Sequence, residues 1–143
     1  MRNVTTNLII AAAAFVGAAG MASAQTMEAK IPFAFRASGK VLAPGTYEVR
    51  MLRGPSGVHQ FVIRSEGNGA VLTVAFNDGN AKKAWTETGN GVLSFECGVS
   101  RCALHEIWTG IQGTPVYQVP APSLGKDEPV RTAEIALQPA KTN

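Results

Sequence analysis

Short segments of alternating apolar and polar residues, separated by turn-forming residues, restrict the fold of this chain more than any other feature. Turn signals rich in Gly, Asn, Asp and Pro recur about every eight to twelve residues. The clearest strand pattern is at residues 46–52, where Tyr47, Val49 and Met51 alternate with other residues, which places these three side chains on one face of a strand. No stretch shows apolar residues at the 3.6-residue spacing of a helix over the length of a typical helix. The sequence therefore predicts an all-β chain, either a single antiparallel β-sandwich or a partly open β-barrel of roughly seven to nine strands.

Four later segments refine this prediction. Residues 70–76 are almost continuously apolar, which favours a central strand covered on both faces. Residues 77–80 read as a turn, because Asn and Gly accept positive φ at little cost. Residues 81–87 suggest a weaker strand around Trp85, and residues 131–138 suit either a last strand or a short helix. The residues expected in the core are Ile31, Phe33, Phe35, Tyr47, Val49, Met51, Phe61, Ile63, Leu72, Val74, Leu93, Phe95 and Leu104.

Residues 1–24 have the three parts of a secretory signal peptide. Arg2 supplies a positive charge, residues 8–19 form an apolar run, and small residues lead up to Ala24. The apolar run is shorter than the ~20 residues that a membrane-spanning helix needs. We therefore expect cleavage after Ala24 and a secreted or periplasmic chain with no transmembrane anchor. In this interpretation residues 25–120 form the β core, and residues 121–143 are an extended C-terminal segment that could add one last strand.

Charge and aromatic content limit the classes of partner. The net charge is only +3, and Lys82-Lys83 is the only adjacent basic pair outside the signal segment. Nucleic-acid binding needs a clustered basic surface, so we do not expect it. Another envelope protein or a polysaccharide is the kind of partner that such a chain could take. Trp85, Trp108 and the two tyrosines could line a sugar-binding face or could simply pack in the interior.

Both cysteines lie in one predicted β-hairpin, at residues 93–108. Cys97 and Cys102 flank a four-residue link, so they would lie opposite each other, within the spacing that a disulfide needs. In that register Phe95 faces Leu104, and Leu93 faces Glu106. An oxidising compartment favours a disulfide. Free thiols and a metal or redox site remain open as alternatives.

The same hairpin supplies the candidates for catalysis and metal binding. His105 is three residues from Cys102, an odd offset, so its ring is expected on the face opposite the sulfurs. A structural zinc site takes four ligands, and this hairpin offers only three, which are Cys97, Cys102 and His105. His105 would face Ser94, yet no orienting acid or oxyanion hole is evident for a triad. We therefore expect no catalytic residue here.

Asn77, Asp78 and Asn80 are oxygen-bearing residues in one loop, the kind of position at which secreted β-proteins often hold calcium. Their spacing misses the EF-hand pattern, and only one of the three is charged. A plain turn explains them better. We expect no metal and no cofactor.

Three segments carry a resemblance. Ile31-Pro32-Phe33-Ala34-Phe35, residues 39–49 and residues 104–108 resemble uncharacterised small secreted β-rich proteins of acidobacterial type, which show IPFxF, GKxLPAGxYxV and a later hairpin ending near IW. This chain has Ala43-Pro44-Gly45 where that pattern has Pro-Ala-Gly. Residues 44–49 are also similar to the entry strand of transthyretin-like and carboxypeptidase-regulatory-like modules, which are β-sandwiches that serve as spacers or binding units. Neither resemblance implies catalytic residues.

Together these features predict a secreted or periplasmic, non-enzymatic β-domain that acts as a structural or binding module. One alternative is a small β-barrel carrier of an apolar ligand, which requires an interior cavity. The other is a weak hydrolase or thiol-redox enzyme, which requires Ser94, His105 and an acid in one cleft.

Overall fold

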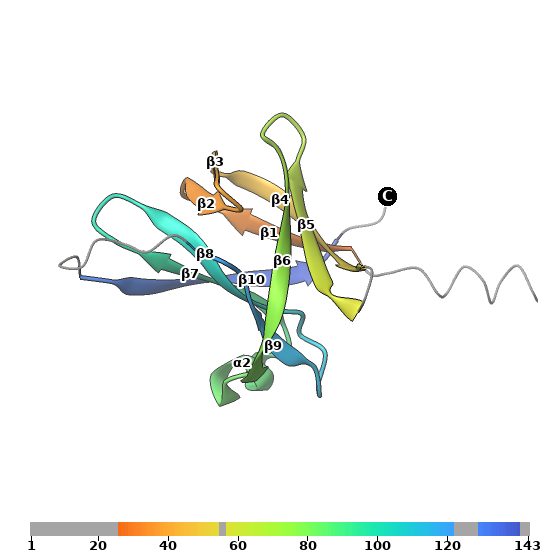
Figure 1. Cartoon of the computed structure of the whole chain (residues 1–143). Helices are drawn as coiled ribbons and strands as arrows, with labels where there is room; N and C mark the ends of the chain where they lie inside the picture. Colours follow the sequence, from red (N-terminus) through yellow and green to blue (C-terminus); the bar gives the residue numbers. More distant parts are fainter. Residues whose placement is uncertain (1–25, 55–56, 122–128, 141–143) are drawn as a thin grey trace, which may run out of the picture.

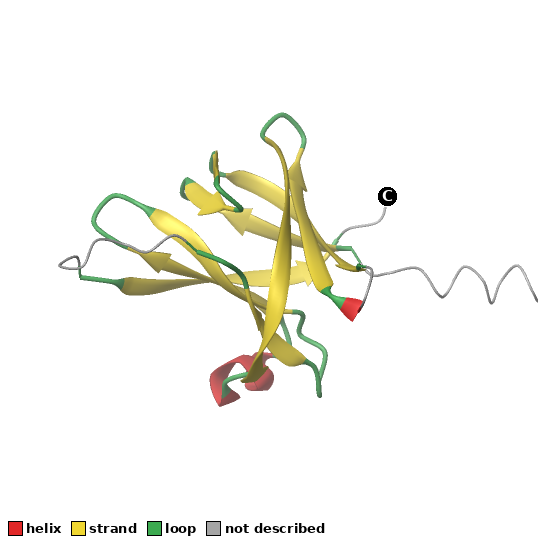
Figure 2. Cartoon of the chain, viewed as in Figure 1, coloured by secondary structure: helices red, strands yellow, loops and turns green. Residues whose placement is uncertain are grey.

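The computed structural model describes residues 26–54, 57–121 and 129–140. The expected signal peptide, residues 1–24, lies outside the described residues. Strands make up most of the described chain, joined by tight turns and by the short helix α2 (Figures 1 and 2). The elements are β1 (Met27–Ile31), β2 (Phe35–Ala37), β3 (Lys40–Leu42), β4 (Gly45–Arg53), β5 (His59–Ser65), β6 (Gly69–Asn80), α2 (Lys83–Thr88), β7 (Gly91–Cys97), β8 (Cys102–Trp108), β9 (Pro115–Gln118) and β10 (Arg131–Pro139).

Eight of the described strands form a closed antiparallel barrel. Their order is β8-β7-β10-β1-β4-β5-β6-β9, and pairing between β9 and β8 completes the ring. The β2–β3 hairpin is attached to β8 through a parallel bridge between Arg36 and Ala103. The prediction of an all-β fold is confirmed, and the arrangement is a closed barrel rather than a sandwich.

β10 completes the barrel between β7 and β1. It pairs with β7 at seven positions, from Arg131 opposite Cys97 to Leu137 opposite Gly91, and with β1 at two, including Met27 opposite Pro139. In Figure 1, β1 and β10 meet near the end of β10 and diverge toward its start. Of the two possibilities for residues 131–138, the structure has the strand.

Aromatic side chains fill the barrel interior. Phe35 packs edge to face on both Tyr47 and Phe95, with ring centroids 5.2 and 5.4 Å apart. Near the other end Phe61 packs on Tyr117 at 5.5 Å. An eight-stranded barrel has an interior just wide enough for side chains to fill. Most of the expected core is confirmed as buried, including the side chains Ile31, Phe35, Tyr47, Val49, Phe61, Ile63, Leu93, Phe95 and Leu104, whereas Phe33 and Met51 are partly buried.

The predictions for Leu72 and Val74 were wrong. β6 buries Val71, Thr73 and Ala75, whereas Leu72 and Val74 point outward and are 51% and 37% exposed. The strand is therefore covered on one face only. Its apolar composition gave no alternation from which the buried face could be read.

The segment around Trp85 is a helix, not the predicted strand. Residues 81–87 include Ala, Lys and Glu, which favour helices, and α2 ends at Gly89 with a left-handed φ of 74°. The helix places Trp85 against Val92, Trp108 and Val116 in a second cluster on the outside of the barrel. The predicted turn at residues 77–80 is instead the irregular end of β6, where the register with β9 shifts.

A bulge at His105 changes the register of the cysteine hairpin. Cys97 lies opposite Cys102, and Phe95 lies opposite Leu104, as predicted. Beyond this point one extra residue on β8 shifts the pairing, because His105 has no partner on β7. Leu93 therefore faces Ile107 instead of the predicted Glu106.

Candidate functional site

The outer surface of β4, β5 and β6 carries an unusual concentration of exposed apolar side chains. Phe76 is 59% exposed, and Leu72 and Val74 lie beside it along β6. In a small soluble domain isolated exposed apolar residues are ordinary, whereas a contiguous patch marks an interaction surface. We define the apolar face as the set Leu52, Val58, Val62, Leu72, Val74 and Phe76.

Strand register makes these residues neighbours. Val62 on β5 lies opposite Leu72 on β6, and Gln60 lies between Leu52 on β4 and Val74 on β6. Side chains directly opposite on one face of a sheet have Cβ atoms about 4.5–5.5 Å apart. Val62 and Leu72 are therefore direct neighbours, whereas Gln60 separates Leu52 from Val74.

Charged residues border the apolar face at one end and along β4. At one end the Arg64 Nε lies 3.1 Å from the Glu48 Oε2, and both side chains are substantially exposed. Arg50 lies along the β4 side, and its Nη2 donates to the Thr26 Oγ1 at 3.3 Å. The border thus carries both signs of charge.

An acidic cleft of about 690 Å³ adjoins the Glu48 end of the apolar face. Glu28 on β1 lies directly opposite Glu48 on β4, and Glu66 lines the same cleft with Arg64. Among the described residues no group of three or more His, Cys, Asp or Glu side chains is placed to hold a metal ion. We therefore assign no site to this cleft.

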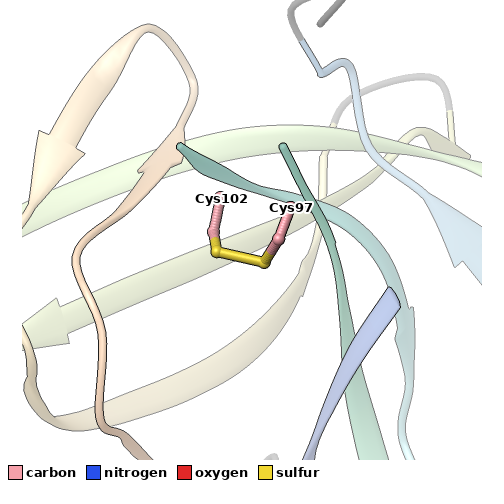
Figure 3. Close-up of a disulfide and its surroundings, with 2 residues drawn as sticks. All are labelled: Cys97 and Cys102. Atoms are coloured by element: carbon pink, nitrogen blue, oxygen red, sulfur yellow. A yellow bond between two sulfur atoms is a disulfide. The ribbon is translucent and has the colours of Figure 1, made fainter. Parts of the chain in front are cut away.

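Cys97 and Cys102 form a disulfide at the turn end of the β7–β8 hairpin (Figure 3). Their Cα atoms are 4.0 Å apart, and Cys97 is buried in the core. The disulfide prediction is confirmed. Because both sulfurs are bonded to each other, the alternatives of free thiols and of a thiolate metal site do not apply to this structure.

Ser94 and His105 do not form a catalytic pair. The His105 Nε2 lies 3.4 Å from Glu96 Oε1, and Ser94 lies opposite Glu106. Ser94 is only 1% exposed, so a substrate has no access to its hydroxyl in this conformation. The bulge that displaces His105 from the position opposite Ser94 was not visible in the sequence.

The apolar-carrier alternative requires an interior cavity, and aromatic side chains occupy the described barrel interior. The fully buried side chains inside the barrel include Tyr47, Phe35, Phe61 and Phe95. The clefts found along the described strands are surface hollows, such as the acidic cleft and one of about 330 Å³ between β1 and β10.

The aromatic residues considered for sugar binding are also internal. Trp85, Trp108, Tyr47 and Tyr117 are each 5% exposed or less. Their rings are thus covered by protein, and they provide no open stacking platform.

In the described part of the chain, none of the helices is both long enough and apolar enough to span a membrane.

Comparisons with known proteins add no constraint on function. No protein-family model, curated protein or solved structure matches the chain.

Proposed function

We propose that this chain is a non-enzymatic binding module that works outside the cytoplasm and binds a protein partner through the apolar face. The disulfide supports an oxidising location, as does the signal-peptide pattern of the sequence. The observation that carries the proposal is the exposure of Leu72, Val74 and Phe76 along one face of β6, with Val62 of β5 opposite Leu72.

A protein fits this surface better than a polysaccharide. Sugar rings stack on exposed aromatic faces, and the apolar face has a single aromatic residue, Phe76, whereas both tryptophans and both tyrosines are buried. Leu52, Leu72 and Val74 offer aliphatic surface instead, and a polypeptide with a matching apolar patch can cover it. Apolar centres with polar borders are the usual anatomy of protein interfaces.

Site-specific photo-crosslinking in the exporting cell tests this proposal. A photoreactive residue at Val74 should give a discrete adduct, whereas one at Val41, which is 64% exposed on β3, should not. The Val41 position is a matched control because it is equally apolar and lies away from the apolar face. If position 74 gives no adduct, or no more than position 41, the proposed function is wrong.

A further inference from the structure

The barrel is closed unevenly, and its weakest join lies between β1 and β10. β10 pairs with β7 at seven positions, whereas its pairing with β1 ends at Glu28 opposite Gln138, and beyond this point the two strands diverge (Figure 1). We call the β1 side of residues 132–136 the free edge of β10. We propose that the free edge binds one extended segment of a partner protein, which adds to β10 as a further strand. This site is separate from the apolar face, so the inference goes beyond the proposed function.

Two hydrogen bonds fix which backbone groups of β10 point toward the free edge. The Ala140 N–H donates to the Thr26 carbonyl oxygen at 3.0 Å, so the even-numbered residues of β10 turn their N–H and C=O groups toward β1. At the tip of the β7–β8 hairpin, the Gly98 N–H donates to the Arg101 carbonyl oxygen at 2.7 Å. The odd-numbered residues of β7 therefore face β10, and they lie opposite its odd-numbered residues. Both observations assign the even-numbered residues of β10 to the free edge.

Thr132, Glu134 and Ala136 therefore direct their backbone N–H and C=O groups at the free edge. Among the strands that the structure describes, β1 is the one on this side of β10, and its last paired residue is Glu28. Lys30, the next β1 residue that faces β10, has no register partner there. A hollow of about 330 Å³ lies between the two strands at this level. The free edge thus combines backbone groups that have no strand partner with space beside them.

The inward side chains of β10 mark where the join opens. Leu137, next to the last paired position, is 2% exposed, whereas Ala133 and Ile135 on the same side of the strand are only partly buried. Ile135 also lines the hollow. Phe33 packs on Phe95, the residue opposite Ala133, with ring centroids 5.1 Å apart, so aromatic side chains occupy the interior beside the opening. The opening therefore exposes the edge of a strand and not the interior of the barrel.

The chemistry of the free edge selects a polypeptide. Backbone groups on one side of a strand repeat about every 6.8 Å, which is twice the rise per residue, and an extended polypeptide carries complementary groups at the same repeat. A lipid or a sugar does not. The recess lies between two strands of one barrel, so a single extended segment fits it better than a second folded barrel. Both strands that flank β10 are antiparallel to it, and we place the added segment antiparallel as well.

Nuclear magnetic resonance of the purified, exported chain tests the free edge directly. In the chain alone, the amide protons of Thr132 and Glu134 should exchange with solvent at least about tenfold faster than those of Ala133 and Ile135, which face β7. The peptide acetyl-Thr-Val-Thr-Val-Thr-amide, added at up to about 5 mM, then serves as the probe for strand addition. Its binding should shift the amide signals of Thr132, Glu134 and Ala136 and slow their exchange.

Methylated peptides separate strand addition from contact through side chains alone. In an antiparallel pair with the Val side chains turned inward beside Ile135, the backbone of the central Thr faces β10 and that of each Val faces away. One N-methyl group on the central Thr should therefore weaken binding at least about tenfold, because it removes a hydrogen bond and holds the two strands apart. One N-methyl group on a Val should change binding by less than about threefold.

Proline variants at two adjacent positions provide a matched control in the chain itself. Proline lacks the N–H group, and a strand accepts it where that group has no partner in the sheet. Thr132→Pro should therefore keep the urea midpoint of the wild type and weaken peptide binding at least about fivefold. Ala133→Pro should lower the urea midpoint, because the Ala133 N–H faces β7.

Four results would overturn the inference. They are slow exchange at Thr132 and Glu134, a Thr132→Pro variant as unstable as Ala133→Pro, no binding of the peptide at its highest concentration, and equal weakening by the two N-methyl groups. Self-association of the chain that Thr132→Pro abolishes would replace the partner segment with a second copy. The proposed function is tested separately, by the crosslinks at position 74.

Discussion

The Trp85 indole Nε1 donates a hydrogen bond to the Glu134 Oε2 at 3.0 Å, which connects helix α2 to strand β10 across 49 residues of sequence. Lys82 adds to this contact. Its Nζ lies 3.9 Å from the Glu134 Oε1 and 4.9 Å from the centre of the Trp85 ring. The outer cluster and the strand that completes the barrel are therefore joined through the Glu134 carboxylate.

Replacing Trp85 by Phe should lower the free energy of unfolding by about 1–2 kcal/mol, because the ring stays but the hydrogen bond is lost. Trp85→Ala should cost about 3–5 kcal/mol, since it also empties the cluster with Val92 and Trp108. Urea unfolding followed by far-UV circular dichroism measures both. Glu134→Gln is the control, because its amide oxygen can still accept the bond. An equal loss in Trp85→Phe and Trp85→Ala would show that packing in this cluster contributes little.

Removing the disulfide with Cys97→Ala and Cys102→Ala together should lower stability by about 2 kcal/mol and leave the barrel folded. The bond closes a very short loop, so the unfolded chain gains little entropy when it is cut. Urea midpoints of the oxidised wild type and the double variant give the difference. Complete loss of folding in the double variant would show that the bond stabilises the hairpin far more than loop entropy predicts.

Stability should fall as the pH rises above about 10, and Tyr47 should be one cause. Burial raises the pKa of Tyr47 above its ordinary value of 10.0, although a side-chain hydrogen bond with Asn68 opposes this in part. Below pH 10 the phenol is neutral in both states and contributes no pH dependence. Above that pH the unfolded chain loses the proton first, so the folded state becomes relatively less stable.

Tyr47→Phe separates this effect from other alkaline effects. The variant should lose about 1 kcal/mol at neutral pH, because the Tyr47 hydroxyl donates to the Ala43 carbonyl oxygen. Its stability should then decline less steeply than that of the wild type above pH 10. Parallel slopes for the two proteins in urea titrations at pH 8 to 11 would rule out Tyr47 as the source.

Core and surface apolar residues should respond in opposite ways to truncation. Phe95→Ala should cost about 3–5 kcal/mol, since its ring contacts Phe33 and Phe35 inside the barrel. Leu72→Ala should change the stability of the monomer by about 0.5 kcal/mol or less, because half of this side chain is in water. Measuring both at low protein concentration avoids any contribution from association. A large loss in Leu72→Ala would mean that β6 is covered on both faces after all.

Intact mass spectrometry of the exported chain tests the processing. The expected species begins at Gln25, as the signal-peptide pattern predicts, and gains two hydrogen atoms on reduction of the disulfide. A mass that retains residues 1–24 would contradict the predicted cleavage, and an unchanged mass on reduction would contradict the bond in the exported protein.

The sequence predicted well wherever the local pattern decides the structure. Tyr47 and Val49 alternate with polar neighbours, so their burial followed from a period of two. The Cys97–Cys102 pairing followed from a short turn between two strands. These features depend on residues close together in sequence.

Features that depend on contacts between residues far apart in the sequence were not predicted. Leu72 and Val74 are as apolar as their buried neighbours, and only the closure of the barrel decides which face of β6 turns inward. The helix around Trp85 is stabilised by a contact with Glu134 on β10. The candidate site was missed for the same reason. Because β6 was predicted to be covered on both faces, none of its apolar side chains was expected to be exposed.

The position of β10 also sets the order in which the chain can fold. Met27 on β1 pairs with Pro139 on β10, so residues near opposite ends of the described sequence must meet before the barrel is complete. The β4–β5–β6 and β7–β8 hairpins need only nearby residues and can form early. Until residues 131–139 emerge from the ribosome or a translocation channel, β1 and β7 each keep an open edge, which is a site for unwanted strand pairing. Completion of the barrel is therefore a late, long-range step, and a chain truncated before residue 131 should be prone to aggregate.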